Sequence, residues 1–177
     1  RTGPFFACEH AGITPDFLCI GKAFASVLPM AATLCTKRIE QAFRGARDQA
    51  FYYGHTFCGN PLGAALAREV LRIYRDEDIL GNVAKQSRKI ATAFSELSSI
   101  AGVERVRSLG MIGAADLGGL GYGGEVGWKV YEEARKRGAY LRPLGDTVYV
   151  CPPLVIDDGA LDELLDIVRK SVRAVLS

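Results

Sequence analysis

The stretch ITPDFLCIGKAFASVLPMAATLC, residues 13–35, decides the fold of the first part of this chain. Two short apolar runs, residues 16–21 and 30–36, are bounded by proline, glycine and lysine and predict two β-strands. A single charged residue, Lys22, lies between them, directly after the first predicted strand. Because burial of an unpaired ammonium group is strongly unfavourable, a lysine between two apolar strands needs a reason and is a candidate functional residue.

The composition is that of an ordinary globular protein. The 177 residues are 49% hydrophobic and 24% charged, enough to bury one good-sized core or two small ones. Lysine and arginine together number 22 against 20 aspartates and glutamates, without a basic block. We therefore expect neither nucleic acid nor a membrane as a partner, and no apolar run approaches the roughly 18 residues of a membrane span.

Cysteine usage favours reduced thiols. The five cysteines are odd in number, widely spaced and free of CxxC pairs, which argues against a disulfide framework and a zinc cluster and for a cytoplasmic protein. His10 and His55 are the only histidines, and without a convergent cluster of Cys, Asp or Glu we expect no metal site. The chain begins RTGPFFACEH, without methionine or signal peptide, so we expect the natural polypeptide to be longer.

The best-marked helix covers residues 59–78. Asn60 is suited to the cap and Pro61 to the first helical position, and an apolar stripe follows at helical spacing. The stripe consists of Leu62, Leu66, Val70 and Ile73.

The remaining elements alternate between the two types. Helical spacing of apolar residues predicts further helices over 37–46, 79–99, 125–138 and 158–176. Trp128 and Tyr131, at helical spacing, are expected in the core, and GGLGYGG (118–124) is expected to be a mobile connection, not a phosphate-binding loop. Strands are predicted at 103–110 and 111–119, and as a hairpin of 139–144 with 147–153 around Gly145-Asp146.

These elements predict a mixed α/β fold with a domain boundary near residue 78, where the charged run RDED ends the long helix. Residues 79–177 contain enough strands and helices to close a small domain. Residues 1–78 do not, because their few apolar strands would leave parallel-type sheet edges uncovered. We therefore predict that 1–78 is the end of a larger sheet and 79–177 a small C-terminal domain.

Lys22 and the loop YYGHTFCGNPLG (52–63) together indicate a ligand. Open α/β sheets bind ligands at the carboxyl ends of their strands, where desolvation favours a neutral, nucleophilic lysine amine. The loop offers backbone N–H groups, the Thr56 hydroxyl and a helix N-terminus to an anion such as phosphate. The alternatives are a lysine that reaches solvent at the strand end and an ordinary capped loop; the combination favours a phosphate-bearing aldehyde.

Several motifs resemble one known family. RTG at residues 1–3, FFACEHAGITPDFLCIGKAF, LPMAATL, GHTFCGNPLG and LRPLGDTVYVCPPLVI follow one another in the order found in the class III, pyridoxal-phosphate-dependent aminotransferases of fold type I. The resemblance covers the whole chain. It implies that residues 1–78 end the large cofactor-binding domain, that 79–177 are the small C-terminal domain, and that the protein is a homodimer with its active site at the subunit interface.

The resemblance also implies roles for individual residues. Lys22 matches the lysine that attaches covalently to pyridoxal 5'-phosphate, and Thr56 the residue that binds the cofactor phosphate from the neighbouring subunit; His55 lies beside this phosphate site. Arg142 matches the arginine that binds a substrate carboxylate, a task suited to a planar bidentate donor; taken alone it would be a surface arginine at a strand edge. Arg1 falls near the substrate entrance.

Within the class, FACEHAGITPD and the C-terminal segment are most similar to the aminotransferases of biotin synthesis. These convert 8-amino-7-oxononanoate to 7,8-diaminononanoate with S-adenosylmethionine as amino donor. One alternative is another class III enzyme, acting on ornithine, 4-aminobutyrate or a related ω-amine.

The other alternative is a non-catalytic C-terminal fragment. In the family, the aspartate that pairs with the pyridine nitrogen, the aromatic residue that stacks on the ring and the N-terminal phosphate loop all precede the position of Arg1. The segment KAFASVLP (22–29) also departs from the family pattern, because it is one residue shorter and lacks a pair of glycines. This leaves the cofactor-facing geometry after Lys22 open.

Overall fold

The computed structural model describes residues 1–24 and 27–177, and these divide into two compact units. The first unit is Ala7–Asp78; the second unit is Ile79–Ser177 together with Arg1–Phe6. The segment KAFASVLP lies partly outside the described residues, so the effect of its departure from the family pattern on the cofactor-facing geometry is not tested. The assignment of the two parts of the chain to a large cofactor domain and a small domain also stays a prediction.

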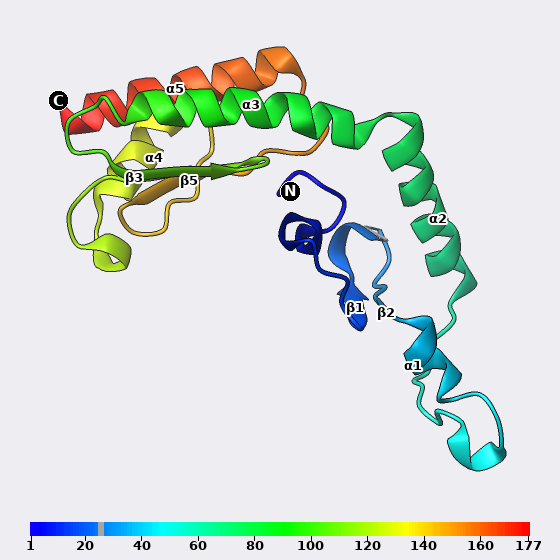
Figure 1. The fold of residues 1–177 in the computed structure, drawn as a ribbon. Helices are drawn as coiled ribbons and strands as arrows, with labels where there is room; N and C mark the ends of the chain where they lie inside the picture. The colour runs from blue at the N-terminus through cyan, green and yellow to red at the C-terminus, as the bar shows by residue number, and fades with distance from the viewer. Residues whose placement is uncertain (25–26) are drawn as a thin grey trace. The chain divides into compact units, whose positions relative to one another are not determined.

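The first unit contains two strands and two helices (Figure 1), namely β1 (Phe17–Ile20), β2 (Ala32–Cys35), α1 (Lys37–Gln41) and α2 (Pro61–Asp76). Both strands form within the predicted runs. They pair antiparallel, with Leu18 opposite Leu34, so the expectation of parallel-type edges is wrong for this pair. The connection over residues 21–31 is too short for the crossover that a parallel pair requires.

Burial in the first unit is slight. Among its described residues only Gly63 and Ala67, both on α2, are buried. Neither strand carries a buried residue, and Phe17 on β1 is 58% exposed. The two apolar strands are therefore uncovered here, because no second layer among the described residues of this unit packs on them. The buried side of α2 also differs from the predicted apolar stripe. Leu62 is 67% exposed, whereas the small residues Gly63 and Ala67 are buried.

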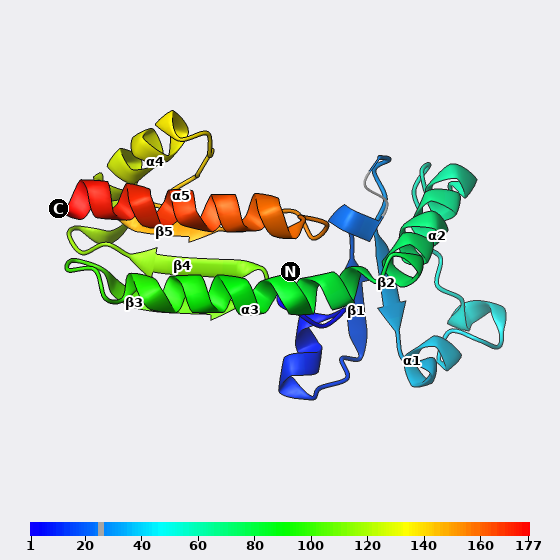
Figure 2. The same cartoon turned by 90° about the horizontal axis from the view of Figure 1, so that it is seen from above.

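The second unit is a sheet covered by helices. The strands β3 (Glu104–Leu109), β4 (Ile112–Asp116) and β5 (Thr147–Val150) form an antiparallel sheet in the order β3-β4-β5. Figure 1 shows α3 (Ile79–Leu97) and α5 (Asp158–Leu176) side by side over one face, and Figure 2 shows β4 beneath the gap between them. The shorter helix α4 (Val126–Lys136) packs against α5. These helices form close to the predicted ranges.

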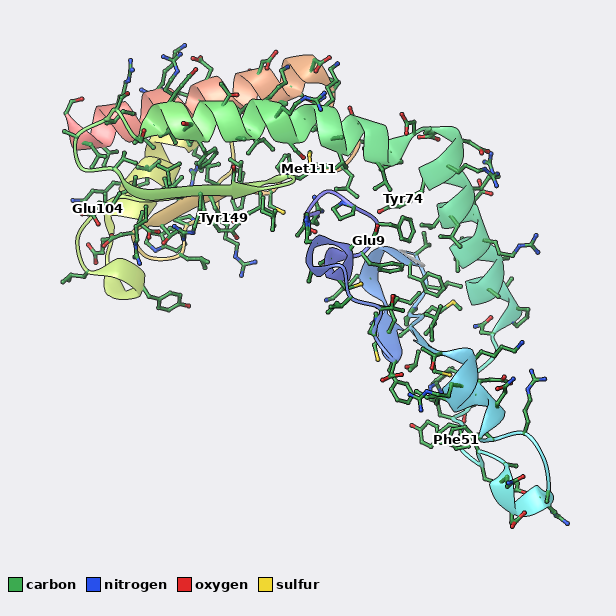
Figure 3. The ribbon with its side chains drawn as sticks, viewed as in Figure 1. Glu9, Phe51, Tyr74, Glu104, Met111 and Tyr149 are labelled. Atoms are coloured by element: carbon green, nitrogen blue, oxygen red, sulfur yellow. The ribbon has the colours of Figure 1, made fainter. Side chains whose placement is uncertain are left out.

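The core of the second unit lies between the helices and the sheet. Ile90 and Phe94 of α3 are buried against β4, where Gly113 has no side chain to keep the helix away. From α5, the core receives Leu161, Val168 and Val172. Tyr149 of β5, in the register of Ala114, lies on the opposite face of the sheet (Figure 3).

The predicted strand at 139–144 is wrong. Only an isolated bridge between Leu144 and Thr147 joins this segment to β5. Its burial does alternate as in a strand, because Ala139, Leu141 and Pro143 are buried and the residues between them are exposed. The period of two is therefore real, but Pro143 has no N–H to donate to a ladder.

A polar junction fixes the start of α5 to α3. Asn82 Nδ2 donates to the carbonyl oxygen of Leu154 at 2.8 Å, and buried Gln86 donates to Asp158 Oδ1 at 3.2 Å. Lys85 and Lys89 both form ion pairs with Asp158. The hydrogen bonds from Lys85, Lys89 and then Gln86 lower the pKa of Asp158 to about 2.

This junction predicts an acid-sensitive step. The pKa of Asp158 is lower in the folded chain than the ordinary value of about 3.9. The contribution of the ionised Asp158 carboxylate to the free energy of unfolding is therefore present above pH 4 and is lost as the pH falls towards 2. Between pH 4 and pH 2, we expect the free energy of unfolding to fall less steeply in Asp158→Asn than in the unaltered chain. The measurement is urea titration followed by circular dichroism. The control is Glu163→Gln, exposed on the same helix; identical pH profiles for Asp158→Asn and the unaltered chain would contradict this expectation.

Candidate functional site

Lys22 follows β1 by two residues and begins a short 3₁₀ turn, Lys22–Phe24. Its φ of 55° lies in the left-handed region, which is strained for a residue other than glycine. The side chain is exposed, and no group among residues 1–24 and 27–177 hydrogen-bonds or pairs with its amine. Its position past the strand end agrees with the prediction, but the predicted desolvation does not occur within this chain.

The loop before α2 is held by His55. The Nδ1 atom of its ring accepts a hydrogen bond from the Phe57 N–H at 3.2 Å, and its carbonyl oxygen accepts one from the Cys58 N–H at 2.9 Å. The His55 N–H in turn faces Cys58 Sγ at 3.4 Å. His55 therefore shapes the loop that carries Thr56, and its Nε2 has no hydrogen-bond partner among the residues that the structure describes.

Thr56 is exposed, and its hydroxyl has no partner among the residues that the structure describes. The helix N-terminus is different, because Asn60 Oδ1 accepts hydrogen bonds from the N–H groups of Leu62 at 3.0 Å and Gly63 at 3.5 Å. The predicted Asn60 cap thus satisfies these two N–H groups, which leaves them unavailable to an anion. Thr56 remains the available group of this loop.

The two candidate substrate arginines belong to the second unit. Arg142 is exposed between buried Leu141 and Pro143, and within the described chain it has no ion-pair partner. Arg1 Nη1 donates to the carbonyl oxygen of Pro152, and the Arg1 carbonyl accepts from the Met111 N–H at 2.7 Å. Arg1 is thus anchored to the β3–β4 hairpin, whereas Arg142 is free to bind an anion.

The structure divides the predicted site between the two units. Lys22, His55 and Thr56 lie in the first unit, and Arg1 and Arg142 in the second. The turn at Lys22 contacts α2, which follows the loop carrying Thr56. No hydrogen bond or ion pair between described residues joins any two of these five side chains.

One cleft was missed by the sequence analysis. It has a volume of about 410 Å³ in the second unit and is lined by Glu104, Arg105, Arg107, Asp116, Tyr122 and Thr147, among others. Asp116 accepts a hydrogen bond from Thr147 at 2.7 Å and pairs with Arg105 at 2.8 Å and Arg107 at 3.1 Å. Burial alone would raise the pKa of Asp116, but the hydrogen bonds from Thr147 and Arg107 lower it below its ordinary value.

The glycine-rich loop beside this cleft is tethered. The Asp146 N–H donates to the Gly121 carbonyl at 2.8 Å, and its buried carboxylate accepts from the Val126 N–H at 2.9 Å. The residues that meet at the cleft and this loop are 20 positions (Val126 and Asp146) and 31 positions (Asp116 and Thr147) apart in the sequence, with no local motif that would have signalled the contacts. The expected mobile connection at 118–124 is therefore attached to the turn before β5.

Two further features bear on function, namely a metal-binding cluster and a membrane-spanning helix. In the part of the chain that the structure describes, no three His, Cys, Asp or Glu side chains are grouped so that they could hold a metal ion. Among those same residues, no helix has the length and apolar character needed to cross a membrane.

Comparison with known proteins identifies the family to which the chain is similar. The model for aminotransferase class III matches residues 1–172. The adenosylmethionine-8-amino-7-oxononanoate aminotransferase of Geobacter sulfurreducens is 37% identical over 99% of this chain and 41% of its own length. The putrescine–pyruvate aminotransferase of Pseudomonas aeruginosa is 33% identical over 96% of this chain and 39% of its own.

A solved structure agrees with these relatives. An amine transaminase from an uncultivated Pseudomonas species, in a PLP-bound form, superposes with a TM-score of 0.86 at 27% identity. The match covers 100% of this chain and 42% of that one. The chain thus spans about 41% of the length of the first of the curated relatives it matches.

The cap of α2 gives a prediction about the loop that carries Thr56. Replacement of Asn60 by Ala removes the acceptor of the Leu62 and Gly63 N–H groups, at a cost of about 1 kcal/mol in helix stability. We expect faster amide hydrogen exchange at these two positions. Asn60→Asp restores an acceptor and serves as the control; unchanged exchange in Asn60→Ala would show that the cap does not protect the helix start.

Proposed function

The chain belongs to the class III aminotransferases, and from this premise we propose that it supplies the catalytic lysine and a substrate carboxylate site of a pyridoxal 5'-phosphate-dependent transaminase. The observation that carries the proposal is Lys22, an exposed amine without a described partner, held in a left-handed conformation just after β1. Because the chain spans 41% of its relative in Geobacter sulfurreducens, the activity proposed is that of a longer protein.

The residues present fit two parts of the cofactor. An amine free of ion pairs can condense with an aldehyde, which suits Lys22. An exposed hydroxyl at a loop held by His55 can donate to a phosphate oxygen, which suits Thr56. In the family, the groups that bind the pyridine nitrogen and the ring face lie upstream of the position of Arg1.

The mechanism follows from these residues. When bound, pyridoxal 5'-phosphate serves as the electron sink for the bonds at the substrate α-carbon. Lys22 Nζ, as a neutral amine, takes the proton from the α-carbon of the amino donor and later returns a proton as an acid. Thr56 would hold the phosphate of the cofactor that is bound in the neighbouring subunit, as the family resemblance implies. Arg142 binds the substrate carboxylate through its planar fork and so orients the α-carbon, and we assign Arg1 a contact near the substrate entrance.

The finer proposal names the substrates. We propose 8-amino-7-oxononanoate as amino acceptor and S-adenosylmethionine as donor, in biotin synthesis. The support is the 37% identity to the Geobacter sulfurreducens aminotransferase named for these compounds. The second candidate is a transaminase of ω-amines, which the 33% identity to a putrescine–pyruvate aminotransferase favours.

We also propose a homodimer with the active site at the subunit interface. The loop before α2 exposes four aromatic side chains, which is typical of an interaction surface; they are Phe51 at 67%, Tyr52 at 72%, Tyr53 at 73% and Phe57 at 78%.

A cytoplasmic location fits the five cysteines, all of which are free thiols. If the chain exists alone, we expect weak cofactor binding and no turnover.

Lys22 gives the direct test. In the full-length protein, borohydride reduction should add the mass of one pyridoxyl phosphate per chain, measured by intact mass spectrometry. In Lys22→Ala we expect no such addition and a loss of transamination of about 10³-fold or more, because proton transfer and attachment both depend on the amine. Lys37→Ala, at an exposed lysine of the same unit, is the control. A Lys22→Ala enzyme with normal turnover would refute the proposal.

The amino donor separates the two substrate proposals. We expect the full-length enzyme to transfer an amino group from S-adenosylmethionine to 8-amino-7-oxononanoate, and to use putrescine or 4-aminobutyrate poorly. The measurement is product formation by mass spectrometry with each donor at equal concentration. Preference for putrescine with pyruvate as acceptor would replace the biotin assignment by the ω-amine assignment and leave the role of Lys22 unchanged.

A further inference from the structure

The segment 139–144, between α4 and β5, carries Arg142 and one other prominent side chain, Tyr140. Ala139 and Leu141 are 8% and 5% exposed, whereas Tyr140 is 76% exposed and Arg142 is also exposed. In an extended segment, residues two apart point to the same side, with a rise of roughly 6.5 Å between them. Tyr140 and Arg142 are therefore neighbours on the outer side of this segment.

The ring of Tyr140 packs on one end of a row of aromatic rings from α4. Its ring meets that of Tyr131 edge to face, with centroids 5.4 Å apart and an interplanar angle of 84°. Tyr131 makes the same kind of contact with Trp128 at 5.7 Å, and the Arg135 guanidinium lies over the Tyr131 ring at 5.9 Å. Edge-to-face contacts of this kind are favourable beyond the area that they bury, so the ladder from α4 fixes the ring.

The ladder corrects the sequence analysis. Trp128 and Tyr131 were expected in the core, but Trp128 is 49% exposed and Tyr131 is half-buried. The core side of α4 is instead provided by Val130 and Ala134. The aromatic residues therefore do not fill the interior, and their arrangement leads to the exposed ring beside Arg142.

We propose that Tyr140 is a specificity-determining residue, an immobilised aromatic surface that contacts the methylene groups next to the carboxylate bound by Arg142. This inference rests on the proposed function of Arg142. A ring that is already fixed loses little conformational entropy when a ligand covers it. The ring face favours an aliphatic monocarboxylate, because a second carboxylate placed on that face would lose hydration and lie against its negative charge density.

The experiment measures kcat and KM of the full-length enzyme for straight-chain monocarboxylate substrates of increasing length and for dicarboxylates of matched length. In Tyr140→Ala we expect the KM for the long monocarboxylates to rise about tenfold, the equivalent of losing contact with one to two methylene groups. We expect kcat to change less than about twofold, since the contact is shared by the ground and transition states. The preference for monocarboxylates over dicarboxylates should fall by the same factor.

Three further variants make the result specific. Tyr140→Phe keeps the ring and should behave as the unaltered enzyme. Tyr131→Ala removes the support of the ring and should raise KM by a smaller factor. Leu120→Ala removes an apolar side chain that is 85% exposed in the glycine-rich loop and should leave KM unchanged.

The outcomes distinguish this inference from the function on which it rests. If Arg142→Ala raises KM for every carboxylate while Tyr140→Ala leaves the dependence on chain length intact, Arg142 keeps its role and the proposal for Tyr140 is overturned. A fall in kcat in Tyr140→Ala that is equal for all substrates shows a structural role and also overturns it. If Arg142→Ala has no effect on KM, the carboxylate site itself is wrong and both ideas fail.

Discussion

The close approach of α3 to β4 at Gly113 is the constraint on which the second unit depends. A Cβ atom at Gly113 would lie 2.5 Å from Phe94 Cδ2 and 2.7 Å from Ile90 Cγ2. The helix therefore packs directly on the backbone of the strand, as densely as atoms permit. With α3 fixed, the junction at Asp158 fixes α5, and the helices cover one face of the sheet while Tyr149 lies on the other (Figure 3).

The sequence predicted those elements whose partners lie within the chain. The helices α3 and α5 form close to their expected ranges, because each buries an apolar stripe in the same unit. The position of β1 was predicted correctly, but its exposure was not. An apolar run indicates that a strand is covered without showing which element covers it. In 139–144 the period of two was correct, but periodicity does not reveal whether a neighbouring strand accepts the hydrogen bonds.

The residues of the candidate site were likewise predicted only in part. Lys22 stood out because a charge directly after an apolar strand is rare, and the structure places it at that strand end. At the start of α2, Asn60 uses the N–H groups of Leu62 and Gly63 for the cap, so the Thr56 hydroxyl is the group of this loop left for the expected anion. The cleft at Asp116 was missed because its hydrogen-bond partner Thr147, on the neighbouring strand β5, lies 31 positions further along the sequence.

The proposed chemistry and the proposed recognition fall in units of different packing. Lys22 and Thr56 lie in a unit in which only two small residues, Gly63 and Ala67, are buried among those described, whereas Arg142 and Tyr140 lie on a unit with a continuous core. Recognition of a substrate carboxylate needs fixed geometry, which a dense core and an aromatic ladder provide. Substitutions along that ladder can therefore alter which carboxylate is preferred while the residues that carry out proton transfer remain the same.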